Sequence, residues 1–268
     1  MTDAGFAPPV TRPAVWHADW LVPEWPTSGV GALMTTRRGG IGTAPFDSFN
    51  LRDGLGDDPQ AVAHHQRQLA QAAGAVPVYL DQVHGASVVR LTAADARPVA
   101  PLREADASIT TEPGLACTVQ VADCLPVLFA APQGRAVGAA HAGWRGLAGG
   151  VLEATVRAMC EASGCAPAEL HAWLGACIGP RRFEVGSDVL AAFGADPTAR
   201  FEPAFMRCGP GKWLADLPLL ARERLRRAGV VSIGGGDWCT ASNRSRFFSF
   251  RRDGVTGRMA ALVWIEPG

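Results

Sequence analysis

The chain has 268 residues, of which 48% are hydrophobic and 19% are charged, so it can fill a core and is not a disordered tail. Lys+Arg and Asp+Glu each number 25, and the resulting zero net charge argues against a dedicated nucleic-acid binder, which would carry a basic excess. No repeat, low-complexity block or Gly/Ser linker divides the chain. We therefore expect a single domain over residues 1–268.

The first 28 residues are expected to be an irregular segment that packs its indoles, Trp16, Trp20 and Trp25, on the body of the protein. Acidic residues and prolines interrupt any apolar stretch that a signal peptide would need. The most apolar run, residues 115–132, is too short and too polar to span a bilayer. The seven cysteines are odd in number and follow no repeating spacing, which is typical of reduced thiols. These features predict a cytoplasmic protein without a membrane segment.

The first half of the chain alternates between strand and helix patterns. Residues 29–36 predict a strand, followed by a polar glycine loop at 37–40 (RRGG). The DDP run at 57–59 predicts a helix start, with an aspartate cap and a proline at the first helical position, and Gly74 ends that helix. Residues 78–91 predict either a strand pair or one strand with a break.

The second half continues this alternation and ends in a predicted hairpin. The predicted elements are two adjacent strands within 115–131 that separate near Asp123, a strand at 136–140, a helix at 147–160, a strand at 171–178, a helix at 216–228, and a hairpin of 246–252 with 258–265. Strands that alternate with helices and also pair in hairpins predict an α/β fold of the α+β type with mixed sheets.

Several catalytic motifs are absent from the sequence. There is no G-x-x-x-x-G-K-[ST] phosphate loop, because Gly211-Lys212 is followed by Trp213. The sequence also lacks a G-x-S-x-G elbow, an H-E-x-x-H zinc helix and the paired motif of the zinc deaminases. No G-x-G-x-x-G follows a predicted strand, so a dinucleotide cofactor has no evident site.

The remaining candidates are histidines and a cysteine near glycines. His84 precedes Gly85 at the end of a strand-like run, and His141 ends an apolar strand just before a helix. Cys124 follows Asp123 between two apolar strands. His64 and His65 are adjacent within the first predicted helix and face different directions, so we interpret them as part of a solvated face.

Composition and spacing alone do not decide between three interpretations of these residues. Cys124 could be a small buried side chain, with the histidines as hydrogen-bonded strand ends. His84, Cys124 and His141 could instead hold a metal with one open position, as in catalytic zinc sites. Alternatively, Cys124 could be a nucleophile with His141 or His84 as base, oriented by Asp123 or Gln82. The same three side chains serve both functional interpretations.

At these residues the chain resembles the YfiH family, also described as laccase-domain, polyphenol oxidase or purine nucleoside phosphorylase proteins. The similarity runs in order from about residue 30 to the C-terminus. The motifs that carry it are TTRRGG at 35–40, NL at 50–51, GDDP at 56–59, QVHG at 82–85, ADCLP at 122–126, HAGWRG at 141–146, IGP at 178–180 and FFSFRRDG at 247–254.

The resemblance implies a four-layer α/β/β/α sandwich and one zinc ion held by His84, Cys124 and His141. The implied activity is phosphorolysis of adenosine, inosine or guanosine to the free base and ribose 1-phosphate. Methylthioadenosine cleavage and adenosine deamination are implied as well. Copper-dependent polyphenol oxidation, with copper as the alternative metal, ranks lower, because one cysteine and two histidines make a single metal site. No nucleic-acid or membrane partner is expected.

We assign further roles to residues near these motifs. Arg145, Arg37 and Arg251 are candidates to bind phosphate, since the planar guanidinium group can bind two oxygens at once. Asp123 is a candidate for proton transfer or for orienting a ligand histidine. Gln82 is a candidate to anchor a histidine or the substrate.

The chain departs from the family's pattern at two positions, and two other classes of function are also considered. Phe183 and Phe250 stand where the family often has tyrosine, so two hydroxyls that could contact substrate are absent. A cysteine hydrolase acting on amide or peptidoglycan-precursor substrates through Cys124 and His141 remains an alternative. A partner-binding protein with a structural zinc is less favoured, because structural zinc sites normally have four protein ligands.

Overall fold

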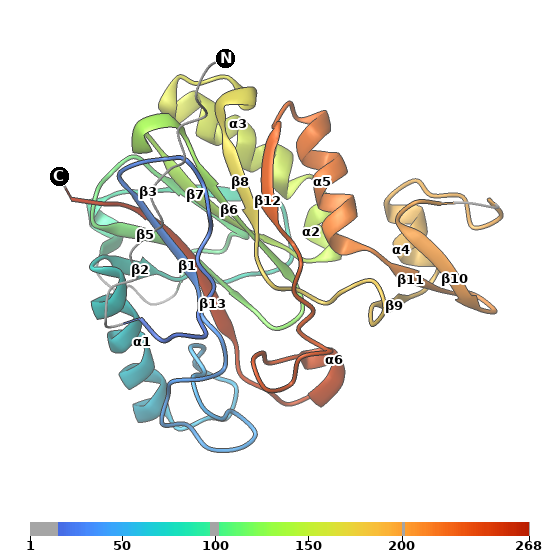
Figure 1. The fold of residues 1–268 in the computed structure, drawn as a ribbon, viewed down its shortest axis with the longest axis horizontal. Coiled ribbons are helices and arrows are strands. Elements are labelled where there is room, and N and C mark those ends of the chain that lie inside the picture. Colours follow the sequence, from blue (N-terminus) through green and yellow to red (C-terminus); the bar gives the residue numbers. More distant parts are fainter. Residues whose placement is uncertain (1–15, 97–101, 200–201, 268) are drawn as a thin grey trace, which may run out of the picture.

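The computed structural model describes residues 16–96, 102–199 and 202–267. This part of the chain contains three β-sheets and six α-helices (Figure 1). The predicted mixed α/β class is therefore confirmed. Over the same residues, none of the helices has the length and apolar character that crossing a membrane requires.

A four-stranded sheet forms one side of the core. Its strands, in spatial order, are β1 (Val30–Met34), β13 (Met259–Ile265), β5 (Leu115–Val121) and β2 (Val76–Val78). The first three are antiparallel, and β2 runs parallel to β5.

A six-stranded mixed sheet lies next to the first. Its order is β12 (Ser232–Gly235), β8 (His171–Leu174), β6 (Leu125–Ala130), β7 (Val137–Ala142), β4 (Ala107–Thr110) and β3 (Val88–Leu91). β5 and β6 are the two strands predicted within 115–131, and they belong to different sheets. The turn between them therefore connects the two sheets.

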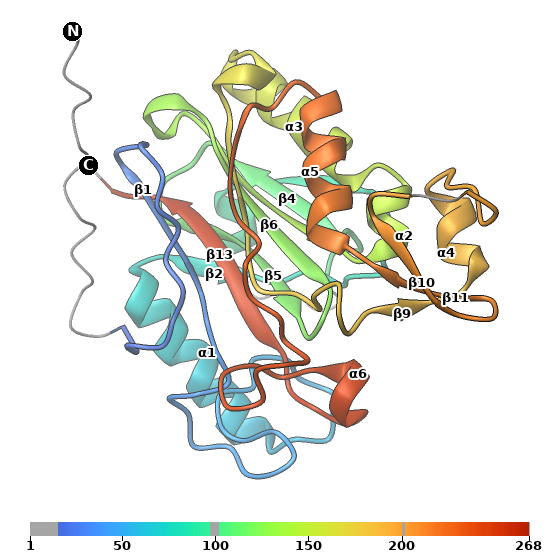
Figure 2. The ribbon, with the colours of Figure 1, turned by 45° about the vertical axis from the view of Figure 1, so that its right-hand side comes forward.

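A small third sheet projects from the body of the protein together with helix α4 (Ser187–Ala192) (Figures 1 and 2). Its strands are β9 (Glu184–Val185), β10 (Phe205–Gly209) and β11 (Lys212–Ala215), in the order β10-β11-β9.

The helices begin and end largely where the sequence indicates. In α1 (Pro59–Ala73), the Asp58 side chain accepts the Gln60 amide, and Gly74 caps the other end at φ 63°. Helix α5 (Leu217–Arg227) matches the prediction for 216–228. The helix predicted at 147–160 is instead two helices, α2 (Trp144–Ala148) and α3 (Val151–Ser163). Gly150, at φ 91°, separates them.

The predicted C-terminal hairpin is wrong in its first arm. β13 pairs with β1 and β5, whereas residues 250–253 form the short helix α6 (Phe250–Asp253). Ser249 caps this helix by accepting the Arg252 amide, and the carboxylate of Asp123 accepts the Arg251 amide at 2.6 Å. The backbone amides that a hairpin would need are thus bound elsewhere, although the turn residues are typical of a hairpin.

Three apolar clusters hold these elements together. One joins α1 to the four-stranded sheet, with Leu33, Leu69 and Leu262 among its members. A second lies between the two large sheets, and a third joins the six-stranded sheet to α3 and α5. Trp20 of the N-terminal segment is buried in the first cluster, and Trp16 packs against it. Residues 1–15 of that segment lie outside the described residues.

His65 is not part of a solvated face. Its side chain is fully buried, its Nε2 accepts the Ile41 amide at 2.9 Å, and its Nδ1 lies 2.8 Å from the Asn50 carbonyl oxygen. Burial lowers the pKa of His65, in keeping with a neutral ring that donates from Nδ1. The helical spacing of Val62, His65 and Leu69 puts it on the buried face of α1.

Candidate metal centre

A loop, a turn and a strand end bring together His84, Cys124 and His141. His84 lies in the loop between β2 and β3, Cys124 in the turn between β5 and β6, and His141 near the end of β7. One potential ligand atom from each lies within 4.8 Å of the others, and this is the one such group found among the described residues. The pairing of Leu125 with Ala142 brings the start of β6, and hence Cys124, beside the end of β7.

Two residues at this site have a left-handed backbone. His84 has φ 64°, and Asp123, which precedes Cys124, has φ 96°. A residue other than glycine in this conformation destabilises the folded state by about 1–3 kcal/mol, although aspartate and histidine tolerate it better than most. The contacts around the two turns must therefore hold the ligands in place.

Asp106 supplies much of that support. Its fully buried carboxylate lies 2.7 Å from His141 Nδ1 and accepts the backbone amides of Val83, His84 and Gly85 at 3.2, 2.9 and 2.6 Å. Three successive amides of this kind form an anion-binding nest. The contact at Nδ1 leaves Nε2 of His141 for a ligand, as carboxylate–histidine pairs do at metal sites. One carboxylate thus positions both ligand histidines.

The sequence interpretation missed Asp106. It expected Asp123 or Gln82 to orient a ligand histidine, whereas the structure gives that contact to Asp106. The available signal was a charged residue between the alanines at 105 and 107, where an unpaired carboxylate would be costly to bury.

Charge interactions at the site favour a thiolate. Burial raises the pKa of Cys124, but hydrogen bonds and charge from His141 and His84 outweigh it and lower this pKa to about 6. Burial lowers the pKa of His141, but Asp106 and Cys124 outweigh it and raise this pKa to about 9. Burial opposes ionisation of Asp106, yet the contacts with His141 and the loop amides hold its pKa below the usual value. At neutral pH these shifts favour a Cys124 thiolate beside a protonated His141, and a cation bound by both residues would displace the proton from His141.

Alkylation of zinc-stripped protein tests this electrostatic interpretation. We expect the rate at which iodoacetamide modifies Cys124 to stay high down to about pH 6 and to fall below it as the thiolate gains a proton. Peptide mass spectrometry measures the rate at this one thiol, with the exposed Cys208 as the internal comparison. A rate that already falls below about pH 8, as for an ordinary thiol, would contradict the predicted shift.

The donor set fits a zinc ion. Two imidazoles and one thiolate are ligands of the borderline-soft kind that zinc takes, and three protein ligands leave one position for water or substrate. Gly143 keeps room beside them, because a Cβ there would lie 2.9 Å from His84 Cδ2 and 3.0 Å from Cys124 Sγ.

Replacing Gly143 with alanine is therefore expected to weaken zinc binding by roughly tenfold, or about 1.4 kcal/mol. The backbone of Gly143 (φ −62°, ψ 159°) is accessible to alanine, so crowding of the ligands is the principal effect. Competition with a chromogenic chelator measures the affinity. Gly209→Ala is the control, since a Cβ there meets nothing nearer than 3.8 Å. Equal affinities in the two variants would show that Gly143 does not shape the site.

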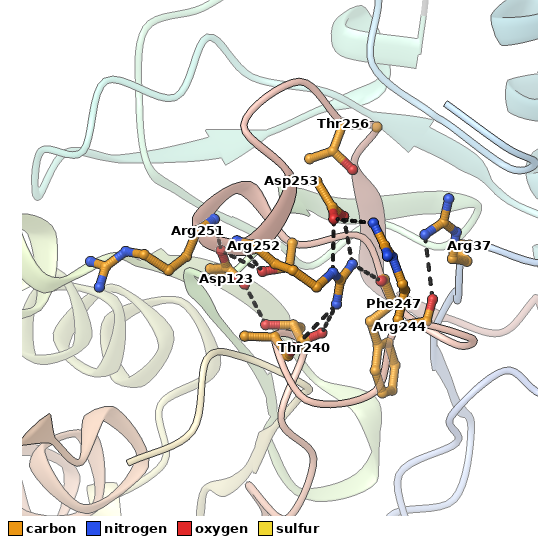
Figure 3. A network of polar contacts seen from close by, with 12 residues as sticks. Arg37, Asp123, Thr240, Arg244, Phe247, Arg251, Arg252, Asp253 and Thr256 are labelled. Atoms are coloured by element: carbon orange, nitrogen blue, oxygen red, sulfur yellow. Dashed lines mark hydrogen bonds and ion pairs between the residues drawn. The ribbon is translucent and has the colours of Figure 1, made fainter. Parts of the chain in front are cut away.

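The Asp123 carboxylate binds residues of the segment that leads into α6. Its carboxylate accepts the hydroxyls of Thr240 and Ser249 at 2.5 and 3.0 Å, together with the Arg251 amide (Figure 3). These contacts fix the 240–251 loop against the turn that carries Cys124. A role for Asp123 in proton transfer stays a prediction.

Gln82 uses its side-chain amide within the protein. Its Nε2 donates to the Gln120 carbonyl oxygen at 2.9 Å, and its Oε1 accepts the Gln120 amide at 2.8 Å. The side chain thus joins the His84 loop to the end of β5. Its predicted contact with substrate is not tested by this arrangement.

The three candidate phosphate arginines differ in how their guanidinium groups are engaged. Arg37 Nη2 forms an ion pair with Asp47 Oδ1 at 2.9 Å, and Arg37 lines a cavity of about 750 Å³. Arg251 donates to the Glu184 carbonyl oxygen at 2.8 Å and lies on the other side of the Asp123 network from Arg37 (Figure 3). Arg145 is exposed, and its Cζ lies 4.4 Å from the centre of the Trp144 ring. It forms no ion pair with any described residue.

The two phenylalanines in tyrosine positions have different surroundings. Phe183 is buried beneath the guanidinium of Arg251, whose Cζ lies 5.4 Å from the ring centre. Phe250 is 59% exposed on α6. A hydroxyl on Phe250 would therefore be the more accessible of the two.

Comparison with known proteins gives one consistent result. Residues 31–266 match the family described as multi-copper polyphenol oxidoreductase laccase. A relative from Pseudomonas aeruginosa, named purine nucleoside phosphorylase PA4543, is 49% identical over 92% of this chain and 98% of its own length. Purine nucleoside phosphorylase YfiH of Escherichia coli is 48% identical over 91% of this chain and 98% of its own length.

Solved structures agree with the sequence comparison. Protein NMB0706 of Neisseria meningitidis superposes with a TM-score of 0.85 at 46% identity, covering 93% of this chain and all of that one. YlmD of Geobacillus stearothermophilus gives the same TM-score at 33% identity, covering 92% and 96%. The resemblance carried by the motifs around His84, Cys124 and His141 is thus confirmed, and the chain belongs to the YfiH family, the family described as multi-copper polyphenol oxidoreductase laccase.

Proposed function

We propose that this protein is a zinc-dependent purine nucleoside phosphorylase. It would cleave adenosine, inosine, guanosine and methylthioadenosine with phosphate to release the base and the sugar 1-phosphate. The observation that carries the proposal is the His84, Cys124 and His141 group with its open position, in a chain whose relatives at 49% and 48% identity are named purine nucleoside phosphorylases.

Each side chain at the site would have a distinct role in the reaction. A zinc ion held by the three ligands would supply a Lewis acid and could lower the pKa of a bound water. Asp106 keeps His141 oriented and the His84 loop in place. Asp123 holds the neighbouring loop and is our candidate for moving a proton. Because water could reach the same site, adenosine deamination is a second reaction that we assign to it.

The multi-copper description of the family fits the donor set less well. Oxidation by a laccase-type reaction needs several coppers that pass electrons, whereas one group of three ligands is found in the part of the chain that the structure describes. We therefore infer zinc, with copper as the alternative metal.

A cysteine hydrolase is the second candidate, and one observation favours it. Cys124, His141 and Asp106 form a chain in which the carboxylate lies 2.7 Å from the histidine and the histidine supports a thiolate. In cysteine enzymes the base contacts the nucleophile, and a third group contacts the base and orients it. An amide or peptidoglycan precursor would then be the substrate.

Metal removal separates the two candidates. The protein is dialysed against a chelator and assayed with each purine nucleoside plus phosphate, before and after zinc is returned. We expect phosphorolysis to disappear on chelation and to return with zinc. Activity on an amide substrate that survives chelation but is lost on alkylation would instead identify a cysteine hydrolase.

We also infer that the fold is the four-layer α/β/β/α sandwich expected for the family, in one domain. The support is the placement of the three apolar clusters. They lie between α1 and the first sheet, between the two large sheets, and between the second sheet and α3 with α5.

A further inference from the structure

Two arginines that the sequence interpretation did not single out lie at the end of β5, where the metal ligands gather. Met259, the first residue of β13, pairs with Val121, the last residue of β5. Arg258 therefore lies at the level of the turn that contains Cys124. The Leu51 amide donates to the Arg258 carbonyl oxygen at 3.1 Å, so Arg52, the next residue, lies beside Arg258.

Asn50 fixes the two arginine backbones relative to each other. Its Oδ1 accepts the amides of Arg258 and Arg52 at 2.9 and 3.1 Å, and its Nδ2 donates to the Arg52 carbonyl oxygen at 3.1 Å. Gly257 allows this approach, because a Cβ there would lie 2.8 Å from Asn50 Cβ. The pair is thus held by a buried polar side chain.

The same segment is joined to the loop that carries His84. Gln120 Nε2 donates to the Leu51 carbonyl oxygen at 2.7 Å, and the backbone of Gln120 binds the side-chain amide of Gln82. Arg52, Arg258 and the metal ligands are therefore parts of one connected framework at one end of β5.

Neither guanidinium group has a close acidic partner. Arg258 Nη1 donates to the carbonyl oxygens of Thr256 and Gly257, which are neutral, and no described carboxylate lies within ion-pair distance of it. Arg52 Nη2 lies 4.0 Å from Asp81 Oδ1, which is the limit for an ion pair. Each group therefore keeps donors available for a further anion.

The local electrostatics agree with this geometry. Burial and the nearby charge of Arg52 lower the pKa of Arg258, while the charges of Cys124 and Asp123 oppose that shift. Arginine stays protonated in proteins, so the two cations repel each other. An anion bound between them would relieve the repulsion and would lie close to the metal ligands.

The other candidate arginines lack this combination. Arg37 donates to Asp47 and to the Arg244 carbonyl oxygen, and Arg251 donates to the Glu184 carbonyl oxygen. Arg145 is available but single, and it stacks on Trp144. Arg52 and Arg258 are near enough for their charges to interact, and neither has a close carboxylate partner, so together they suit a doubly charged phosphate better.

We propose that Arg52 and Arg258 bind the phosphate co-substrate beside the His84, Cys124 and His141 group, a proposal that rests on the phosphorylase function. In the reaction, an oxygen of HPO₄²⁻ bonds to C1′ of the sugar as the bond from C1′ to the base breaks. The bonding electron pair leaves with the base nitrogen, which takes up the proton that phosphate releases. The two arginines hold the attacking dianion and the sugar 1-phosphate that forms from it.

The test measures phosphate binding and turnover in Arg52→Gln and Arg258→Gln, both zinc-loaded. Inorganic phosphate is titrated calorimetrically without nucleoside, and the KM values for phosphate and for inosine are then determined. We expect the phosphate Kd and KM to rise at least about tenfold in each variant, because each loses a charge-assisted contact. The inosine KM should stay within about twofold, and Arg258→Lys should recover part of the affinity because it restores the charge.

Arg226→Gln, on the exposed face of α5, is the matched control and should bind phosphate like the unaltered protein. Should the Arg258 variant misfold, Arg52→Gln still tests the proposal, since the polar contact of the Arg52 side chain with the described residues is the long one to Asp81. Unchanged phosphate Kd in both variants, or an unaltered protein that does not bind phosphate, would overturn the proposal. Phosphate binding that depends on both arginines, without cleavage of any nucleoside, would support the anion site and refute the phosphorylase function.

Discussion

Replacing Asp106 with asparagine is expected to lower the free energy of unfolding by about 3–5 kcal/mol, because it removes one member of a buried charged pair. It should also weaken zinc binding by roughly 10–100-fold, as loss of the carboxylate behind a ligand histidine does elsewhere. The carboxylate contacts His141 and three amides of the His84 loop, so both histidine ligands lose their orientation. Urea unfolding and chelator competition measure the two effects.

The pH dependence of this variant gives an independent check. Because the folded-state pKa of Asp106 is depressed, its ionisation stabilises the protein above the ordinary carboxyl pKa, and this contribution is lost as the pH falls toward the lower, folded-state value. The asparagine variant should therefore lose less stability on acidification than the unaltered protein. Asp95→Asn, at a surface ion pair with Arg103, serves as control and should change zinc affinity little. Equal effects of the two substitutions on zinc affinity would contradict the positioning role.

Replacing Cys124 or His84 with alanine is expected to remove zinc and to lower phosphorolysis by roughly a thousandfold or more, since a metal contributes several kcal/mol of barrier lowering. Each variant leaves two ligands, which are too few to hold the ion against a chelator. Elemental mass analysis of protein purified without a metal-affinity tag gives the zinc content, and the nucleoside assay gives the rate.

The control for these variants is Cys208→Ala, which removes an exposed thiol on β10 and should retain both zinc and activity. About one zinc per chain in the unaltered protein, lost in both ligand variants, is the expected pattern. Full zinc content in Cys124→Ala would place the metal elsewhere, and several copper ions per chain would reopen the oxidase interpretation.

Local signals in the sequence were sufficient for much of the fold. The Asp58 cap and Gly74 define α1, and the polar pair at 123–124 separates β5 from β6. These features depend on a few neighbouring residues, so their patterns can be interpreted without tertiary information. The prediction of a C-terminal hairpin was wrong because Asp123, far away in the sequence, binds the Arg251 amide and stabilises a helix instead.

The site was predictable only in part for the same physical reason. The ligands His84, Cys124 and His141 stand in recognisable motifs, and the structure brings them together. Asp106 lies outside those motifs; it reaches His141 because β4 pairs with β7. Arg52 and Arg258 likewise meet through Asn50 and the register of β13 against β5. A local pattern can mark a polar residue such as Asp106 as one that needs a partner, but it does not show which partner a sheet or loop brings to it.

The most direct test of the central claim is to incubate the zinc-loaded protein with adenosine, inosine or guanosine, with and without inorganic phosphate, and to identify the products by mass. We expect equal amounts of free base and ribose 1-phosphate, formed only when both zinc and phosphate are present. Unchanged nucleosides under all conditions, or release of free ribose without uptake of phosphate, would contradict it.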